Sequence, residues 1–170
     1  MARSGSLEPA VNVGDDPRQF AQVLSAVYDA AMSGARMPAR PRTVISDSWH
    51  RVQGAGVDPD TSSPDIALDL DELEVRRQSS GLATILPDLT RGLGAVIDGG
   101  DNILVVADAQ GRVLWRSGSP RVLMRADRLG FIEGADWAEN NVGTNAIGTA
   151  LMSGRPVQVF SAEHYVRSHH

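Results

Sequence analysis

The stretch GADWAENNVGTNAIGTALMSGRPVQVFSAEHY, residues 134–165, holds the local signals that decide the fold. Turn formers and aromatic side chains are mixed across residues 130–143, which predicts an ordered loop whose aromatics are available for a pocket. Thr144 is placed to cap a helix that continues through Met152. The β-prone segment Arg155–Phe160 then predicts a strand.

Upstream of this stretch, the segment NILVVADAQGRVLWRSG, residues 102–118, predicts a β-hairpin. Two β-prone runs flank Asp108–Gly111, where Asp and Gly suit a tight turn. The nearly continuous apolar run Ile103–Val106 predicts a strand covered on both faces, with Val113–Ser117 as its partner. A helix is expected from Ser119-Pro120 through about Leu129.

The strongest helical periodicity in the chain precedes the hairpin. Apolar residues recur there at three- and four-residue spacing, at Leu82, Ile85, Leu86, Leu89, Leu93, Val96 and Ile97. This spacing places them on one face of a helix, so we expect a helix that is buried along that side.

Three further helices are expected closer to the N-terminus. Asp16-Pro17 is a helix start, and the apolar spacing that follows predicts a helix to about Ser33. A second helix is expected from about Pro41 to Gly54, and a short charged helix over Asp69–Gln78. Residues 57–68 read as an irregular connector.

The composition excludes several classes of protein. The chain has 170 residues, of which 42% are hydrophobic, and it contains no Cys, which excludes disulfide frameworks and Cys-ligated metal centres. Its net charge of −5 gives no overall attraction to nucleic acid. No apolar stretch is long enough for a membrane span or a secretion signal, so we expect a soluble, cytoplasmic protein without membrane partners.

Most candidate catalytic or metal motifs are incomplete. The glycine spacing of residues 143–149, GTNAIGT, is that of a phosphate loop, but the Lys after the second glycine is missing, which excludes a nucleotide triphosphatase. His164, His169 and His170 with Glu163 match no standard metal spacing, so no metal is expected. No G-x-S-x-G pentapeptide supplies a Ser nucleophile.

Two groupings of side chains each leave two interpretations open. Three acidic residues fall within one predicted loop: Glu133, Asp136 and Glu139. They are either paired catalytic carboxylates or a solvated acidic loop. Trp115, Phe131 and Trp137 either line a ligand cavity or form ordinary core.

Three segments together resemble one known family. They are ISDSW at residues 45–49, AGVDP at residues 55–59, and the stretch at residues 134–165. In combination they resemble the GAF sensory domain of bacterial transcriptional regulators of the acetoin and glycerol catabolism type. The similarity runs from about Arg40 to His170, and the preceding residues resemble an N-terminal extension of actinobacterial members.

The resemblance implies an α+β, GAF-like fold, with an antiparallel sheet, packed helices and a small-molecule pocket beside the sheet. It implies an N-terminal helical extension at residues 15–80 and the GAF domain at residues 81–170. Residues 1–14 are small, polar and aperiodic, which predicts a flexible arm. By analogy with the family, the ligand-binding residues are Phe131, Trp137, Glu139, Thr144, Asn145 and His164.

The function implied by the resemblance is regulatory and not enzymatic. We expect a small-molecule-sensing domain of a cytoplasmic transcriptional regulator, coupled to a DNA-binding module outside this chain. Neither the effector nor a cofactor is assigned. Two alternatives are a ligand-free dimerisation module, in which helices 16–33 and 82–97 pair across a two-fold axis, and the sensor of an RNA-binding antiterminator.

The chain departs from the family pattern after His170, where relatives continue with another β-hairpin and a closing helix. The sheet of this chain is therefore expected to be incomplete, with the C-terminal strands and closing helix missing. A bare strand edge recruits another chain. We accordingly expect a homodimer, either simple or with exchanged elements.

Overall fold

The computed structural model describes residues 7–98 and 100–170, so the first six residues of the predicted arm lie outside the described residues. The chain divides into two compact units. Unit 1 combines the chain up to Ser62 with Ala138–His170, and unit 2 is Ser63–Trp137. Each unit is described by itself. The domain boundaries expected at residues 14 and 80 stay a prediction.

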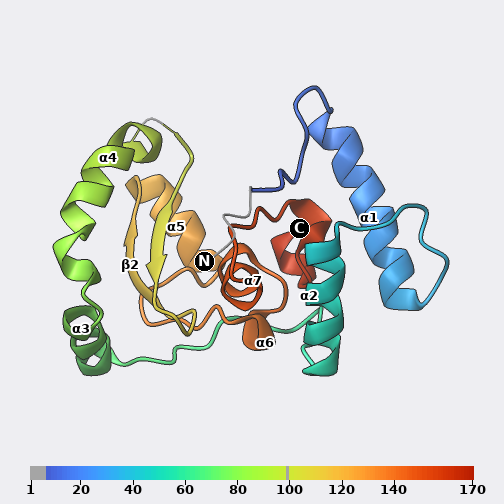
Figure 1. Cartoon of the computed structure of the whole chain (residues 1–170). Coiled ribbons are helices and arrows are strands. Elements are labelled where there is room, and N and C mark those ends of the chain that lie inside the picture. Colours follow the sequence, from blue (N-terminus) through green and yellow to red (C-terminus); the bar gives the residue numbers. More distant parts are fainter. Residues whose placement is uncertain (1–6, 99) are drawn as a thin grey trace, which may run out of the picture. The chain divides into compact units, whose positions relative to one another are not determined.

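Unit 1 contains two of the predicted N-terminal helices, and both are confirmed (Figure 1). Helix α1 spans Pro17–Ser33; the side chain of Asp16 caps its first turn, and Gly34, at φ 69°, ends it in the left-handed conformation. Helix α2 spans Thr43–Gly54 and begins without a side-chain cap.

The C-terminal part of unit 1 consists of short helical elements, namely α6 (Glu139–Val142), α7 (Ala146–Ser153), η2 (Ser161–Glu163) and η3 (Arg167–His169). The helix predicted after Thr144 is present, but its cap is Asn145. The Asn145 Oδ1 atom accepts the backbone N–H of Gly148 at 2.9 Å. An Asn amide oxygen caps as well as a hydroxyl, which leaves Thr144 to point into the interior, where it is fully buried.

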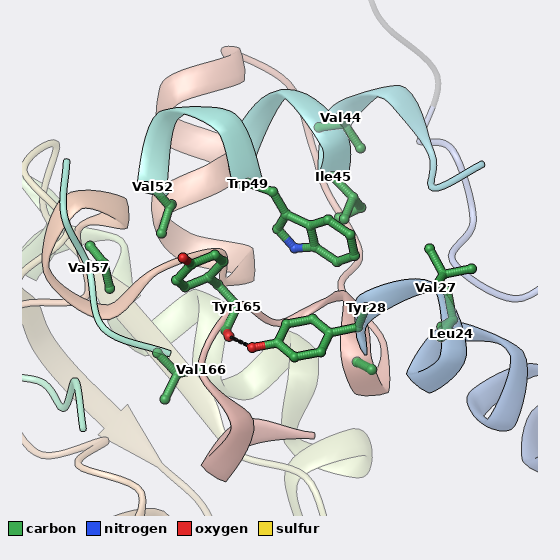
Figure 2. Packing of buried hydrophobic residues seen from close by; sticks show 11 residues of the cluster. Leu24, Val27, Tyr28, Val44, Ile45, Trp49, Val52, Val57, Tyr165 and Val166 are labelled. Carbon is green, nitrogen blue, oxygen red and sulfur yellow. Dashed lines mark hydrogen bonds between the residues drawn. The ribbon is translucent and has the colours of Figure 1, made fainter. Parts of the chain in front are cut away.

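The core of unit 1 joins α1 and α2 to the C-terminal segment, as Figure 2 shows. Tyr28 lies edge-on to Trp49, and its hydroxyl donates to the backbone oxygen of Tyr165 at 2.7 Å. The other buried members of this cluster are aliphatic or small: Leu24, Val27, Val44, Ile45, Val52, Val57, Ala162 and Val166. The side chains of Val157, Val159 and Phe160 pack against the cluster.

The prediction of a strand at Arg155–Phe160 is wrong, because this segment forms no ladder in the described structure. Pro156 has no N–H to donate to a ladder. The polar groups of Gln158 bind other partners instead: its side chain accepts the backbone N–H of Ala10 at 3.0 Å, and its backbone oxygen accepts from Arg42 at 2.6 Å. The β-prone side chains in this segment therefore serve the helical core.

Unit 2 contains the predicted hairpin, which is confirmed (Figure 1). Strands β1 (Leu104–Ala107) and β2 (Val113–Ser117) pair antiparallel, with a register irregularity between Val106 and Ala107. The residues of β1 are half-buried and not covered on both faces as expected. The turn places Gly111 at φ 91°, a conformation that favours glycine.

The predicted helices on either side of the hairpin are also confirmed, as α3 (Leu70–Ser79) and α5 (Pro120–Arg128). Helix α3 begins with a capping box formed by Asp69 and Glu72. It contacts β2, where the Arg77 Nε atom donates to the backbone oxygen of Leu114 at 2.8 Å. The predicted loop is ordered at Gly134, whose N–H donates to the backbone oxygen of Val113.

The strongly periodic helix differs from the prediction in two ways. It is divided into η1 (Leu82–Thr84) and α4 (Leu86–Asp98), because Pro87 has no N–H with which to continue the helix from the preceding turn. Burial along one side is also wrong for four of its apolar residues, which are between 37% and 56% exposed: Ile85, Leu89, Leu93 and Val96. Ile97 is buried.

The fold is α+β, with helices and a small antiparallel sheet of two strands in the described part of the chain. Among the described residues, no helix combines the length and the apolar character that a membrane crossing needs.

Candidate functional site

A buried carboxylate, Glu139, organises the polar interior of unit 1. The guanidinium of Arg51 binds both of its oxygens, with Nε to Oε2 at 2.7 Å and the second contact to Oε1 at 2.9 Å. The hydroxyls of Ser48 and Thr149 contact Oε1 at 2.5 and 2.9 Å. We call these four residues together with Thr144, whose Oγ1 lies 2.6 Å from Ser48 Oγ, the Glu139 cluster.

The hydrogen bonds of the Glu139 cluster form one consistent set. The proton of Ser48 is directed to Glu139, so the hydroxyl of Thr144 donates to Ser48. The side chain of Glu139 is 4% exposed, and the three hydroxyl residues are fully buried. The hydrogen bond to Glu139 raises the pKa of Arg51, so the guanidinium stays charged. The cost of burying the carboxylate is offset by its hydrogen bonds from Arg51, Ser48 and Thr149.

The local sequence explains how these residues meet. Ser48 and Arg51 are three apart on α2 and therefore share one face of the helix. Gly143 follows α6 at φ 74° and ψ −169°, a backbone region that only glycine adopts readily. A Cβ at this position would lie 2.8 Å from the Cβ of Tyr165. The turn at Gly143 therefore ends α6 directly before Thr144, so that Glu139 and Thr144 can both contact Ser48.

A second buried carboxylate, Glu163, lies in the same unit. The Nε atom of Arg42 donates to Oε1 at 2.8 Å, and a terminal nitrogen of Arg42 lies 2.7 Å from Oε2. The backbone N–H of Phe160 also donates to Oε2 at 3.0 Å, and the indole N–H of Trp49 donates to the backbone oxygen of Glu163 at 3.0 Å. This pair connects the start of α2 to η2.

His164 lies next to Glu163 and is half-buried. Its Nδ1 atom is 3.0 Å from the backbone oxygen of Ser161. Burial lowers the pKa of His164 to about 4, so the imidazole is neutral at pH 7. Burial also lowers the pKa of His169. The rings of His164 and His169 lie 6.0 Å apart and nearly perpendicular.

The two aromatic residues of the predicted site belong to unit 2. The rings of Phe131 and Trp137 stack with centroids 3.6 Å apart and planes 8° from parallel. The indole N–H of Trp137 donates to the backbone oxygen of Gly130 at 3.2 Å, and Trp137 is buried. In this structure Phe131 and Trp137 are therefore each other's packing partner.

The six predicted site residues thus fall into two groups. Glu139, Thr144, Asn145 and His164 lie in unit 1, and the aromatic pair lies in unit 2. Among the unit 1 residues, the structure brings Glu139 and Thr144 together through Ser48, whereas Asn145 serves as the cap of α7.

The sequence reasoning missed the partners of the two buried carboxylates. Ser48, Arg51 and Thr149 surround Glu139, and Arg42 binds Glu163. The spacing of Ser48 and Arg51 on the predicted helix was a usable signal, because it places two polar side chains beside the apolar face that carries Trp49. No signal in the local sequence links Arg42 to Glu163, which is 121 positions away.

Two of the acidic residues of the predicted loop pair with different arginines. Glu133 in unit 2 pairs with Arg77 at 2.7 Å, and Glu139 in unit 1 pairs with Arg51. Within the described ranges, no group of three or more His, Asp or Glu side chains is placed to hold a metal ion. The Glu139 cluster can fix α2 against α6 and α7, and its hydroxyls are buried and hydrogen-bonded within unit 1.

The helices and the two-stranded antiparallel sheet place the described part of this chain in the α+β class. In a comparison with solved structures, the chain is similar to a chain in the crystal structure of the E. coli DhaR(N)-DhaL complex, with a TM-score of 0.67 and 24% sequence identity. The similarity covers 75% of this chain and 43% of that one, and it shows the fold. The GAF-like, α+β prediction is confirmed.

The family follows from the sequence comparison. The model described as "MimR, N-terminal domain" matches residues 25–169, so the chain belongs to this family. An uncharacterized 47.3 kDa protein of Rhodococcus erythropolis, encoded in the thcA 5′ region, is 36% identical over all of this chain and 40% of its own length. The acetoin dehydrogenase operon transcriptional activator AcoR of Bacillus subtilis is 40% identical over 85% of this chain and 23% of its own length.

These relatives confirm the predicted resemblance to regulators of the acetoin type. The chain spans 40% and 23% of the length of the two curated relatives.

Proposed function

We propose that this chain is a small-molecule-sensing regulatory domain of a cytoplasmic transcriptional regulator. It would act without catalysis, by binding an effector and passing the change to a DNA-binding module elsewhere in the protein. Family membership supports this proposal most directly, because a named activator of a catabolic operon aligns with 85% of this chain. The fold alone would not favour sensing over other roles.

The buried polar connections of unit 1 support a role in transmission. The Glu139 cluster joins α2 to α6 and α7, and the Arg42–Glu163 pair joins the start of α2 to η2. A domain tied in this way has few intermediate arrangements, so a ligand that prefers one arrangement shifts the whole population toward it.

We further propose Glu139, Thr144, Asn145 and His164 of unit 1, and Phe131 and Trp137 of unit 2, as effector-binding residues. In unit 1, amide, carboxylate and imidazole groups can make polar contacts with a ligand, and in unit 2 the aromatic pair offers apolar contact area; small-molecule sites use both kinds of contact. Effector binding would require these side chains to exchange internal partners for ligand contacts, and that exchange is the conformational signal in this proposal.

Thermal-shift screening of the chain tests the sensing function. Diols, acetoin-like carbonyl compounds, cyclic nucleotides and haem are the probes, because a ligand that binds the folded state raises the melting temperature by mass action. Phe131→Ala should remove the shift, whereas Phe20→Ala, which truncates another stacked and partly buried Phe, should retain it. A shift that survives Phe131→Ala would remove the aromatic pair from the proposed site.

One observation favours dimerisation as a second candidate function. The apolar row formed by Ile85, which precedes α4, and by Leu89, Leu93 and Val96 on α4 is exposed in unit 2, and such a row can mark an interaction surface. Analytical ultracentrifugation of the wild type and of Leu89→Asp/Leu93→Asp tests this candidate. A dimer that the double substitution dissociates supports it, and a monomeric wild-type chain contradicts it.

A further inference from the structure

A cavity of about 280 Å³ lies in unit 1 against one face of α1, apart from the residues proposed above for the effector. Its apolar wall consists of four α1 residues at three- and four-residue spacing: Phe20, Val23, Leu24 and Val27. The rest of the lining consists of residues 8–10, Asn12, residues 39–42 and Glu163. Since one water molecule needs roughly 10–15 Å³ of such space, the cavity has room for a small organic ligand.

One end of this cavity is polar, and Arg42 forms the buried part of that end. Its guanidinium is held in place by Glu163, by the backbone oxygen of Gln158 at 2.6 Å and by the backbone oxygen of Glu8 at 3.2 Å. These contacts use Nε, both N–H groups of one terminal nitrogen and one N–H of the other. Among the described residues, one N–H of this firmly held guanidinium has no partner and can bind a ligand.

The remaining charges at this end favour an anion. Arg42 and Glu163 neutralise each other, which leaves Arg40 and Glu8 on the lining of the cavity. An adjoining small recess shares Glu8 and Arg42 with the cavity and adds Arg155. Within the described residues, Arg40 and Arg155 are exposed and make no ion pair or side-chain hydrogen bond. Among the described residues, two guanidinium groups without an ion pair and one such carboxylate, that of Glu8, thus line the cavity and its adjoining recess, in a chain whose net charge is −5.

From this geometry we propose that the cavity binds a small aliphatic monocarboxylate. The hydrocarbon part lies on the apolar face of α1, and the carboxylate is bound by Arg40 and the free N–H of Arg42. Guanidinium groups match the planar geometry of a carboxylate, and the apolar wall excludes fully polar anions of the same charge. None of the residues that line this cavity is among the six proposed effector residues.

Isothermal titration calorimetry of the whole chain with 4-methylpentanoate tests this proposal. The uncharged isostere 4-methylpentanamide and the cation 3-methylbutylamine serve as comparison ligands. We expect binding of the carboxylate and at least tenfold weaker binding of the other two, because a charge-assisted hydrogen bond is lost or the charge is reversed. Equal binding of the amide or the amine, or no binding of the carboxylate at millimolar concentration, would overturn the proposal.

Variants then locate the site. Arg40→Ala should weaken carboxylate binding about tenfold, whereas Arg128→Ala, an exposed arginine on α5 in unit 2, should leave it unchanged.

Val23 is 45% exposed, so Val23→Trp should fill the cavity without disturbing the core, and Val23→Glu provides the same test by charge repulsion. Binding that is undiminished in both folded Val23 variants would contradict this location. Phe131→Ala should not affect carboxylate binding, which separates this test from that of the proposed function.

Discussion

Both carboxylate oxygens of Glu139 accept hydrogen bonds from the guanidinium of Arg51, at 2.7 Å from Nε and 2.9 Å from the terminal nitrogen. The carboxylate is almost fully buried, whereas the Arg51 side chain is 37% exposed. The arginine therefore keeps part of its hydration while it neutralises the buried charge. Removal of Arg51 would leave the charge of Glu139 buried without a counterion, and this cost falls on the desolvated carboxylate.

Glu139→Gln should destabilise the chain strongly. The amide has one acceptor oxygen in place of two, and its NH₂ group faces Arg51 or the hydroxyls of Ser48 and Thr149 as an additional donor. We expect a decrease of about 2–3 kcal/mol in the free energy of unfolding, because charge-assisted hydrogen bonds are lost in a buried site. Urea unfolding monitored by circular dichroism measures the change.

Glu133→Gln is the matched control for this prediction. Glu133 also pairs with an arginine at 2.7 Å, but its side chain is 36% exposed, so we expect a loss of less than about 1 kcal/mol. If the two variants lost the same stability, the buried network would contribute no more than a surface ion pair.

The secondary structure could be predicted from the sequence where local signals decide it. The Asp16-Pro17 start of α1 and the turn at Asp108–Gly111 are determined by side chains within a few residues, and both are confirmed. Arg155–Phe160 has β-prone side chains but forms no strand, because whether an extended segment joins a ladder depends on a partner distant in the sequence. The Arg42–Glu163 pair is long-range in the same way.

Gly143→Ala should be more destabilising than the replacement of an ordinary turn glycine. The backbone at φ 74° and ψ −169° lies in a region that residues with a Cβ avoid, and the added Cβ would meet the ring and Cβ of Tyr165 at 3.1 and 2.8 Å. We expect a loss of about 2–4 kcal/mol from the combined strain and steric overlap. Differential scanning calorimetry of both proteins provides the measurement.

Gly154→Ala provides the comparison for Gly143→Ala. Gly154 ends α7 at φ 64°, and a Cβ added to it would point into open space, so only the left-handed conformation is penalised. A loss of about 1 kcal/mol is expected. A Gly143→Ala variant as stable as Gly154→Ala would show that Tyr165 yields without cost.

Trp49→Ala should cost about 3–5 kcal/mol of unfolding free energy, because it leaves a large cavity in the core of unit 1 and removes the indole contact with Tyr28. Trp49→Phe separates packing from hydrogen bonding. It retains an aromatic ring but leaves the backbone oxygen of Glu163 without its indole donor, and should cost about 1–3 kcal/mol. Equal losses for the two variants would mean that the hydrogen bond, and not the packed ring, dominates at this position.

The candidate site was predictable in its residue types but not in their arrangement. Glu139, Thr144 and Asn145 were singled out from a loop and helix start, and they are all buried in unit 1. The partners of Glu139 on α2, Ser48 and Arg51, lie 91 and 88 positions away. Their spacing places them on one face of the helix, but it does not show which distant residue packs against that face. The exposed row on α4 is a second example. Its periodicity correctly predicts an apolar face on the helix, but burial of that face depends on which other residues pack against it, and the helix sequence does not show this.

The free energy of unfolding should fall as the pH decreases from 6.5 to 4, and His164 should account for part of that fall. Burial lowers the pKa of His164 from its ordinary value of 6.5 to about 4 in the folded chain. Between these values the unfolded state binds a proton at His164 and the folded state does not, so protonation favours unfolding. Urea unfolding at a series of pH values measures the slope.

His164→Gln should reduce this slope, because Gln cannot be protonated. His169 and His170, whose pKa values are also lowered by burial, retain the remainder. A His164→Gln variant with the wild-type slope would mean that the imidazole of His164 reaches water as easily in the folded chain as in the unfolded one, which the 3.0 Å contact with the backbone oxygen of Ser161 opposes.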